Sequence, residues 1–224
     1  MMELPTVPTP TIAIAGEALR FPVRRIFCVG RNYADHAREM GHDPDREPPF
    51  FFTKPGDAVS DSGVLPFPPR TADLHHEVEW VVALGGGGRN IRVEDAAALI
   101  FGHAVGLDLT RRDLQAEAKK AGRPWDMAKG FDHSAPVGPL RRERPRTDAA
   151  IALSIDGETR QRGRLDDMIW SVEEVIAHIS TFVALAPGDL IFTGTPAGVG
   201  PIRPGDTLRG TVEGLEPSEV RFEG

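Results

Sequence analysis

Glycine and proline interrupt this chain so often that its helices and strands must be short. Of the 224 residues, 24 are glycine and 20 are proline, and they separate a series of short apolar runs. Both residue types favour turns and disfavour helix interiors, so we expect frequent turns and few long helices. The sequence therefore predicts a β-rich α+β protein.

The apolar runs between these turns predict individual elements. Strands are predicted at 25–29, 50–54, 76–84 and 151–155, and helices at 93–100, 110–121 and 172–184. The pair Asp156-Gly157, directly after the fourth strand, is a strong hairpin signal. We find no repeat and no linker, and a chain of this length can bury one substantial core. Residues 21–224 are therefore predicted to form a single domain, preceded by an arm or edge strand at 1–20.

Composition and charge exclude several classes of protein. A net charge of −7 disfavours a nucleic-acid or anionic-membrane surface, and no run approaches the length of a membrane span. Cys28 is the one cysteine, which rules out an intrachain disulfide and disfavours a cysteine zinc site. These features favour a protein of the reducing cytoplasm that binds neither nucleic acid nor membrane.

Two glutamates stand two residues apart inside a strand-forming run. Side chains alternate across a strand, so Glu77 and Glu79 point to the same face. Asp108 ends a second apolar run, and three carboxylates on core-like strands predict an all-oxygen site for Mg²⁺ or Mn²⁺. The alternative interpretation is that the glutamates face water on an edge strand.

A histidine and a glutamate form a second pair of candidates. A short helix is expected from Asn32 to about Met40, and His36 and Glu39, three residues apart on it, share a face. A carboxylate beside an imidazole raises the basicity of the ring, as the activation of water requires. A solvated helix carrying both side chains without a catalytic role is the alternative.

Three further segments carry polar groups in a context that suggests binding. Arg112 and Gln115 follow soon after Asp108. Lys129 lies between aromatic residues, where a partly buried lysine could bind a substrate carboxylate; a surface lysine that extends its ammonium group to solvent is the alternative. The glycine-rich segment 193–201, which includes Thr195, can bring backbone N–H groups close to an anion. It lacks the lysine of a P-loop, so a nucleotide phosphate site is not expected.

Taken together, five motifs resemble one known family. In chain order they read R-N-Y-A-D-H-A-R-E, L-H-H-E-V-E, G-L-D-L-T-R-R-D-L-Q, P-W-D-M-A-K-G-F-D and T-G-T-P-A-G-V-G. This set resembles the fumarylacetoacetate hydrolase family from about Arg25 to the C-terminus, and in particular its short acylpyruvate hydrolases. The similarity is greatest to the fumarylpyruvate hydrolases, whose chains also read F-P-V-R-R-I and D-P-D-R-E-P-P-F-F-F.

The resemblance implies a fold, a cofactor and residue roles. The fold would be a mixed β-sandwich roll, with residues 21–224 as its catalytic domain, in a homodimer with one Mg²⁺ or Mn²⁺ per chain. The implied metal ligands are Glu77, Glu79 and Asp108, and the implied water-activating dyad is His36 and Glu39. Arg112, Gln115, Lys129 and Thr195 would contact the pyruvate portion of the substrate, with Lys129 also counted as catalytic.

The reaction implied is hydrolysis of a C–C bond in a 2,4-dioxo acid, most simply fumarylpyruvate, to pyruvate and a carboxylic acid. If the acyl group is fumaryl, a cation must meet its second carboxylate, and Arg31 and Arg38 are both available. Oxaloacetate decarboxylation and the isomerisation or tautomerisation of 2-oxo acids are alternatives on the same metal site. A non-catalytic, metal-stabilised binding or scaffold protein is the alternative from a different class.

Overall fold

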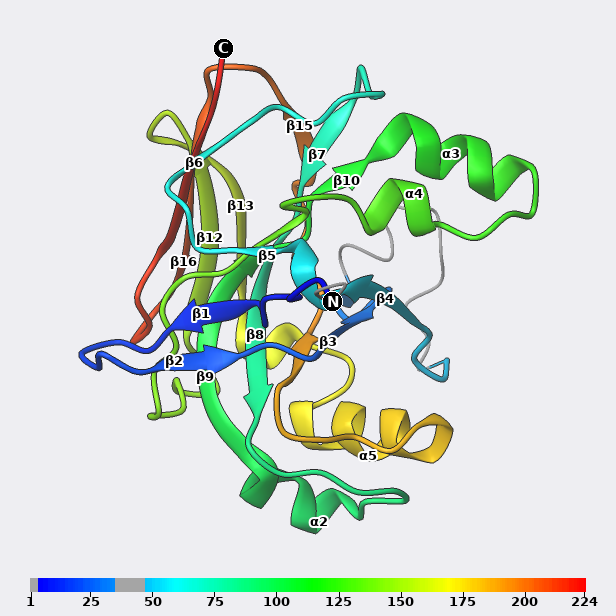
Figure 1. Cartoon of the computed structure of the whole chain (residues 1–224), viewed down its shortest axis with the longest axis vertical. Helices are drawn as coiled ribbons and strands as arrows, with labels where there is room; N and C mark the ends of the chain where they lie inside the picture. The colour runs from blue at the N-terminus through cyan, green and yellow to red at the C-terminus, as the bar shows by residue number, and fades with distance from the viewer. Residues whose placement is uncertain (1–3, 35–46) are drawn as a thin grey trace.

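Two five-stranded sheets packed face to face form the centre of the molecule (Figure 1). The computed structural model describes residues 4–34 and 47–224, and the structural statements below concern these residues. The central sheet has the order β4-β3-β14-β8-β9, formed by Phe51–Pro55, Arg25–Val29, Asp189–Phe192, Val78–Leu84 and Ile100–Leu107. The flanking sheet has the order β13-β12-β16-β17-β6, formed by Glu158–Arg164, Ala150–Ile155, Thr207–Val212, Ser218–Phe222 and Val64–Leu65.

Both sheets mix parallel and antiparallel pairs. In the central sheet β14 runs parallel to β3 and antiparallel to β8. In the flanking sheet β17 runs parallel to β6 and antiparallel to β16. The prediction of a β-rich α+β fold with mixed sheets is therefore confirmed.

Strand β8 is buried on both faces, which explains its almost continuous apolar sequence. Val78, Trp80 and Val82 point into the core between the two sheets. Val81 and Ala83 point to the opposite face, into a second apolar cluster. Glu79 shares this second face, because side chains alternate along a strand. The sheet thus carries a carboxylate into the protein interior.

The second cluster is covered by the N-terminal hairpin and two short strands. The hairpin joins β1 (Thr11–Ala13) to β2 (Arg20–Pro22), and Ile12, Ile14 and Phe21 pack against the central sheet. A parallel pair, β5 (Val59–Ser60) and β11 (Ala135–Pro136), lies beside β1 and β9. Residues before 21 therefore contribute apolar side chains to the interior.

Helices lie at the two ends of the sheets. In Figure 1, α3 (Arg112–Lys120) and α4 (Asp126–Lys129) lie near one end, and α2 (Val93–Ala96) and α5 (Val172–Phe182) near the other. Helix α5 begins at a capping box, in which Ser171 Oγ accepts from the Glu174 N–H and Glu174 accepts from the Ser171 N–H. The short 3₁₀ helices are η1 (Gly56–Ala58), η2 (Ala97–Leu99) and η3 (Leu165–Asp167). None of the described helices has the length and apolar character that crossing a membrane requires.

Most of the predicted elements are present, with changes at their boundaries. The strand expected at 76–84 is divided at Glu77 into β7 (Leu74–His76) and β8. Strand β7 leaves the central sheet and pairs with β10 (Thr110–Arg111) and β15 (Gly200–Ile202). The helix expected at 110–121 therefore begins only at Arg112, because the two preceding residues pair with β7. The helix expected at 93–100 ends early, since Ile100 already belongs to β9.

Candidate metal centre and active site

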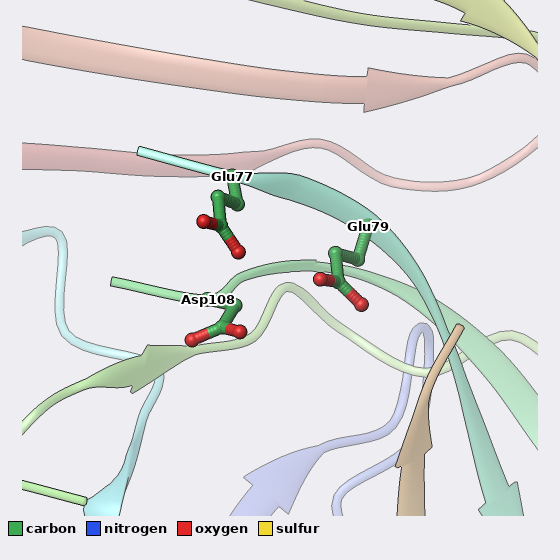
Figure 2. A group of neighbouring side chains, drawn as sticks. All are labelled: Glu77, Glu79 and Asp108. Atoms are coloured by element: carbon green, nitrogen blue, oxygen red, sulfur yellow. The ribbon is translucent and has the colours of Figure 1, made fainter. Parts of the chain in front are cut away.

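Three buried carboxylates converge where strands β7, β8 and β9 end or begin. Glu77 lies in the break between β7 and β8, Glu79 lies in β8, and Asp108 directly follows β9. The pairing of Glu79 with Gly106, and a 2.9 Å hydrogen bond from the Asp108 N–H to the Glu77 carbonyl, bring the three together. One carboxylate oxygen from each lies within 4.8 Å of the others, and Figure 2 shows the three groups around a common space.

The electrostatics of this triad fit a divalent cation. Burial, together with the neighbouring charges of Asp108 and Glu77, raises the pKa of Glu79 well above its ordinary value, although a hydrogen bond from Gly194 opposes the rise. Three such carboxylates at neutral pH are stable together only if positive charge lies between or beside them. Carboxylate oxygens are the ligands that Mg²⁺ and Mn²⁺ prefer, so the residues present suit either ion.

Lys129 is the first of two buried lysines that touch the triad. Its Nζ lies 2.9 Å from Glu77 Oε2 and 2.7 Å from Asp108 Oδ2, and 4.9 Å from the centre of the Phe52 ring. Burial by itself would lower the pKa of Lys129, but the charges of Asp108 and Glu77 outweigh it and raise that pKa. The ammonium group is therefore charged and held at the edge of the metal site.

Lys54 is the second buried lysine, and sequence reasoning did not assign it a role. Its Nζ lies 2.8 Å from Asp108 Oδ1 and donates to the carbonyl oxygens of Leu109, at 3.1 Å, and of Lys129. Lys54 thus holds the carboxylate of Asp108 and the backbone of Lys129 together. A signal was present in the sequence: Lys54 is one of four lysines in a chain with 26 lysines and arginines.

The start of helix α3 carries two of the expected substrate residues. Arg112 Nη2 lies 2.5 Å from Glu77 Oε1, and Arg112 Nη1 donates to Gln115 Oε1 at 2.6 Å. Gln115 is 4% exposed, so it is a buried side chain held by its neighbour on the same helix. Arg112 and Gln115 both line the cavity beside the triad, and their predicted contact with the pyruvate portion of a substrate stays a prediction.

The glycine-rich segment after β14 approaches the triad through its backbone. The Gly194 N–H donates to Glu79 Oε2 at 2.7 Å, so this segment does bring an N–H group to an anion, here a protein carboxylate. Gly194 has φ +96°, and a Cβ there would lie 2.8 Å from the Cβ of Asn32. Only glycine meets both demands without strain.

Thr195 is already engaged within the protein. Its Oγ1 donates to the Val78 carbonyl at 2.8 Å and accepts from Gln161 Nε2 at 2.8 Å. Gln161 is itself buried. Its Oε1 accepts from the Val78 N–H at 3.0 Å and is hydrogen-bonded to His76 Nδ1 at 2.9 Å. For Thr195 to donate its hydroxyl to a substrate carboxylate, the bond to Val78 must break. Gln161 is a second residue that sequence reasoning missed.

A small cavity of about 30 Å³ unites most of these residues. Six of the residues predicted from the sequence line its wall: Glu77, Glu79, Arg112, Gln115, Lys129 and Thr195. It adjoins a larger cavity of about 420 Å³, with which it shares Phe50, Phe52, Trp125 and Lys129. His36 and Glu39 lie outside the described residues, so their predicted role stays a prediction from the sequence.

Comparison with known proteins gives consistent matches over most of the chain. Residues 25–223 match the family described as fumarylacetoacetate (FAA) hydrolase, C-terminal. The crystal structure of fumarylpyruvate hydrolase from Pseudomonas aeruginosa in complex with Mn²⁺ and pyruvate is 48% identical, with a TM-score of 0.95, covering 100% of this chain and 99% of that one.

Two curated relatives have different activities at almost the same similarity. Fumarylpyruvate hydrolase of Ralstonia sp. is 43% identical over 185 residues, 79% of this chain and 94% of the relative. Oxaloacetate tautomerase of Escherichia coli K12 is 42% identical over 204 residues, 89% of this chain and 93% of the relative. The resemblance found in the sequence motifs is thus confirmed, and the chain belongs to the fumarylacetoacetate hydrolase family.

Proposed function

We propose that this enzyme is a metal-dependent hydrolase that cleaves a C–C bond of 2,4-dioxo acids, with fumarylpyruvate as its best substrate. The observation that carries the proposal is one polar cavity whose wall combines Glu77 and Glu79 of the carboxylate triad with Lys129, Arg112 and Gln115. Acidic metal ligands and cationic donors side by side in one wall suit a chelating 2-oxo acid. The hydrolase relatives, and the pyruvate in the Pseudomonas aeruginosa structure, support the same substrate class.

In the proposed reaction, water adds to the C4 carbonyl and the C3–C4 bond then breaks. Its electron pair goes to the pyruvate fragment as an enolate, which takes up a proton at C3, while C4 leaves as a carboxylic acid. Bound Mg²⁺ or Mn²⁺ would supply Lewis-acid stabilisation of the negative charge that develops on the 2-oxo oxygen. Lys129 and Arg112 hold the 1-carboxylate by charge-assisted hydrogen bonds, with Gln115 as an additional donor.

The water-activating step is assigned to His36 and Glu39 by the family pattern and by their spacing in the sequence. Glu39 would orient the imidazole and stabilise its protonated form, while His36 removes a proton from the attacking water. This pair is what separates hydrolysis from the alternatives. Decarboxylation and tautomerisation of oxaloacetate need a polarised 2-oxo acid but no attacking water.

The second candidate function is oxaloacetate tautomerisation or decarboxylation at the same site. It is favoured by the Escherichia coli tautomerase, which matches this chain as well as the Ralstonia hydrolase does. The triad, Lys129 and Arg112 would serve all three reactions. The choice therefore depends on a direct assay.

We expect chelator-treated protein to be inactive and to consume fumarylpyruvate rapidly after Mg²⁺ or Mn²⁺ is added. The measurement is absorbance loss for fumarylpyruvate, acetylpyruvate and oxaloacetate, with pyruvate and fumarate quantified as products. Pyruvate and fumarate in equal amounts would support the hydrolase. Turnover of oxaloacetate alone would instead make the protein a tautomerase or decarboxylase.

Replacing His36 with alanine should reduce fumarylpyruvate hydrolysis by about 10²- to 10⁴-fold, the usual contribution of a general base. Any metal-dependent oxaloacetate decarboxylation should change much less, because it needs no activated water. The measurement compares both activities in the same metal-loaded preparation, with bound Mn²⁺ quantified as a check on the metal site. Equal losses of both activities would contradict a water-specific role for His36.

We also infer a homodimer in the cytoplasm, on the basis of the family resemblance and the composition. Cys28 is fully buried, and burial raises the pKa of its thiol well above the ordinary value, so it is poorly suited to disulfide exchange. Sedimentation equilibrium of the purified chain tests the dimer directly.

A further inference from the structure

The cavity of the metal centre has two ends of different character. Its inner end consists of buried polar side chains, including Glu79, Lys129 and Thr195, each at most 3% exposed. Its outer end includes Arg31, which is half-buried, and Lys119, which is exposed. The inner end accounts for the reacting part of a 2,4-dioxo acid. Of the two outer cations, Arg31 is one of the two arginines considered above for a second carboxylate, and Lys119 has no role assigned so far.

Each of these outer cations contacts an aromatic ring, and the two rings contact each other. The Arg31 guanidinium lies 5.2 Å from the centre of the Phe50 ring, and Lys119 Nζ lies 5.1 Å from the Trp125 ring. The two rings touch edge to face, with centres 5.8 Å apart and an angle of 82° between planes. Each cation therefore rests on one member of an aromatic pair.

Neither outer cation has an acidic partner in the described part of the chain. The ion pairs around the cavity involve Lys129 and Arg112 with the triad carboxylates, and they include neither Arg31 nor Lys119. Desolvation and the positive charges of Arg112, Arg31 and Lys129 lower the pKa of Lys119, and together they outweigh the opposing charge of Glu77. A site of this kind attracts an anion.

The total formal charge of the site also favours an anionic group at the outer end. The triad contributes −3 and a divalent ion +2, while Lys54, Lys129 and Arg112 contribute +3, which leaves +2 at the inner end. Arg31 and Lys119 add a further +2 at the outer end. A substrate with a single carboxylate would neutralise charge only at the inner end, whereas a dicarboxylate matches both.

We propose that Arg31 and Lys119 form a subsite for a second carboxylate, which makes the enzyme selective for 2,4-dioxo acids whose short acyl chain ends in a carboxylate. The proposal rests on the proposed function and assigns the residues that select the far end of its substrate. Phe50 and Trp125 form an apolar wall beside the two cations, suited to the carbon chain that links the two ends of such a substrate. Arg31 and Lys119 are thus specificity residues and take no part in bond cleavage.

The test is a comparison of two substrates in a double variant, Arg31→Met with Lys119→Met. Methionine keeps an apolar chain over each ring and removes the charge. We expect kcat/KM for fumarylpyruvate to fall by about 10- to 100-fold, the range for losing charge-assisted hydrogen bonds. For acetylpyruvate, which lacks the second carboxylate, the change should stay below about threefold. Lys120→Met is the matched control, because Lys120 is exposed beside Lys119 but does not line the cavity.

Calorimetric binding to the metal-loaded protein gives a second readout that does not depend on turnover. Fumarate and crotonate share a carbon skeleton and differ in one carboxylate, so we expect the wild type to prefer fumarate and the double variant to lose that preference. Equal losses with both 2,4-dioxo acids, or no preference for fumarate in the wild type, would overturn the subsite. If neither 2,4-dioxo acid is cleaved but the preference for fumarate persists, the hydrolase proposal fails and the subsite stands.

Discussion

Replacing Glu79 with glutamine should remove Mn²⁺ binding and metal-dependent activity while the protein stays folded. Glu79 supplies one of three converging carboxylates and is 1% exposed, so no solvent-exposed group can take its place. Loss of residues that merely orient metal ligands commonly costs 10- to 100-fold in affinity, so loss of a ligand charge should cost at least about 100-fold. Isothermal titration with Mn²⁺ measures this directly, and wild-type affinity in the variant would contradict the ligand assignment.

In the metal-free protein, Glu79→Gln should instead increase the stability of the folded state. Burial and the charges of Asp108 and Glu77 raise the pKa of Glu79 in the folded state, so above pH 4.5 the folded state retains a proton that the unfolded state releases. Stability from this group therefore falls as the pH rises from the unfolded value of 4.5 toward the raised folded value. In chelator, the variant should gain in Tm relative to the wild type as the pH increases from 5 to 8.

Added Mn²⁺ should give the wild type a higher Tm than the Glu79→Gln variant. At a concentration of 100 times Kd, a bound ion stabilises the folded wild type by about 2.7 kcal/mol, which corresponds to about 5–10 °C for a chain of this size. The Glu79→Gln variant should not respond. Glu219→Gln is the matched control, because Glu219 is exposed on β17 and pairs with Arg209 at the surface. A Tm shift of wild-type size in Glu79→Gln would show that the ion binds elsewhere.

The carboxylate site was predictable from the sequence because its geometry is mostly local. Glu77 and Glu79 are two residues apart, and strand alternation alone directs them to one side. The break at Glu77 was not predictable, because it depends on which partners each half of the run finds. Strand β7 pairs with β10 and β15, whereas β8 pairs with β9 and β14. The convergence of the carboxylates survives this change because Asp108 follows the strand that pairs with β8.

The residues that sequence reasoning missed are those whose role arises from contacts distant in the chain. Lys54 meets Asp108 across 54 residues, and Gln161 meets Val78 across 83. Neither residue lies in a motif with a fixed spacing, and each is surrounded in sequence by ordinary strand residues. A buried lysine or glutamine is recognisable only once the pairing of strands shows what it faces. Recognition of the family from motif order supplied Arg112, Gln115 and Thr195, which spacing alone did not assign.

Replacing Lys54 with methionine should lower the free energy of unfolding by about 3–5 kcal/mol, the usual cost of removing one partner of a buried ion pair. Lys54 is 2% exposed. Its ammonium group forms an ion pair with Asp108 and donates to the carbonyls of Leu109 and Lys129. Methionine has a similar length and no charge, so it leaves Asp108 with one fewer cation and two carbonyl groups without their donor. Urea denaturation of chelator-treated protein measures the change.

A double-mutant cycle separates the ion pair from the carbonyl contacts. Asp108→Asn removes the carboxylate charge, so the combined variant should be less destabilised than the sum of the two single variants, with a coupling of about 0.5–3 kcal/mol. The loss of stability that remains in the double variant is due to the Leu109 and Lys129 carbonyls, which asparagine at position 108 does not provide with a donor. Lys120→Met, at an exposed site, should change stability by less than about 0.5 kcal/mol. Strictly additive losses would mean that Lys54 stabilises the backbone alone, and the charge of Asp108 would then depend on Lys129 and the bound metal.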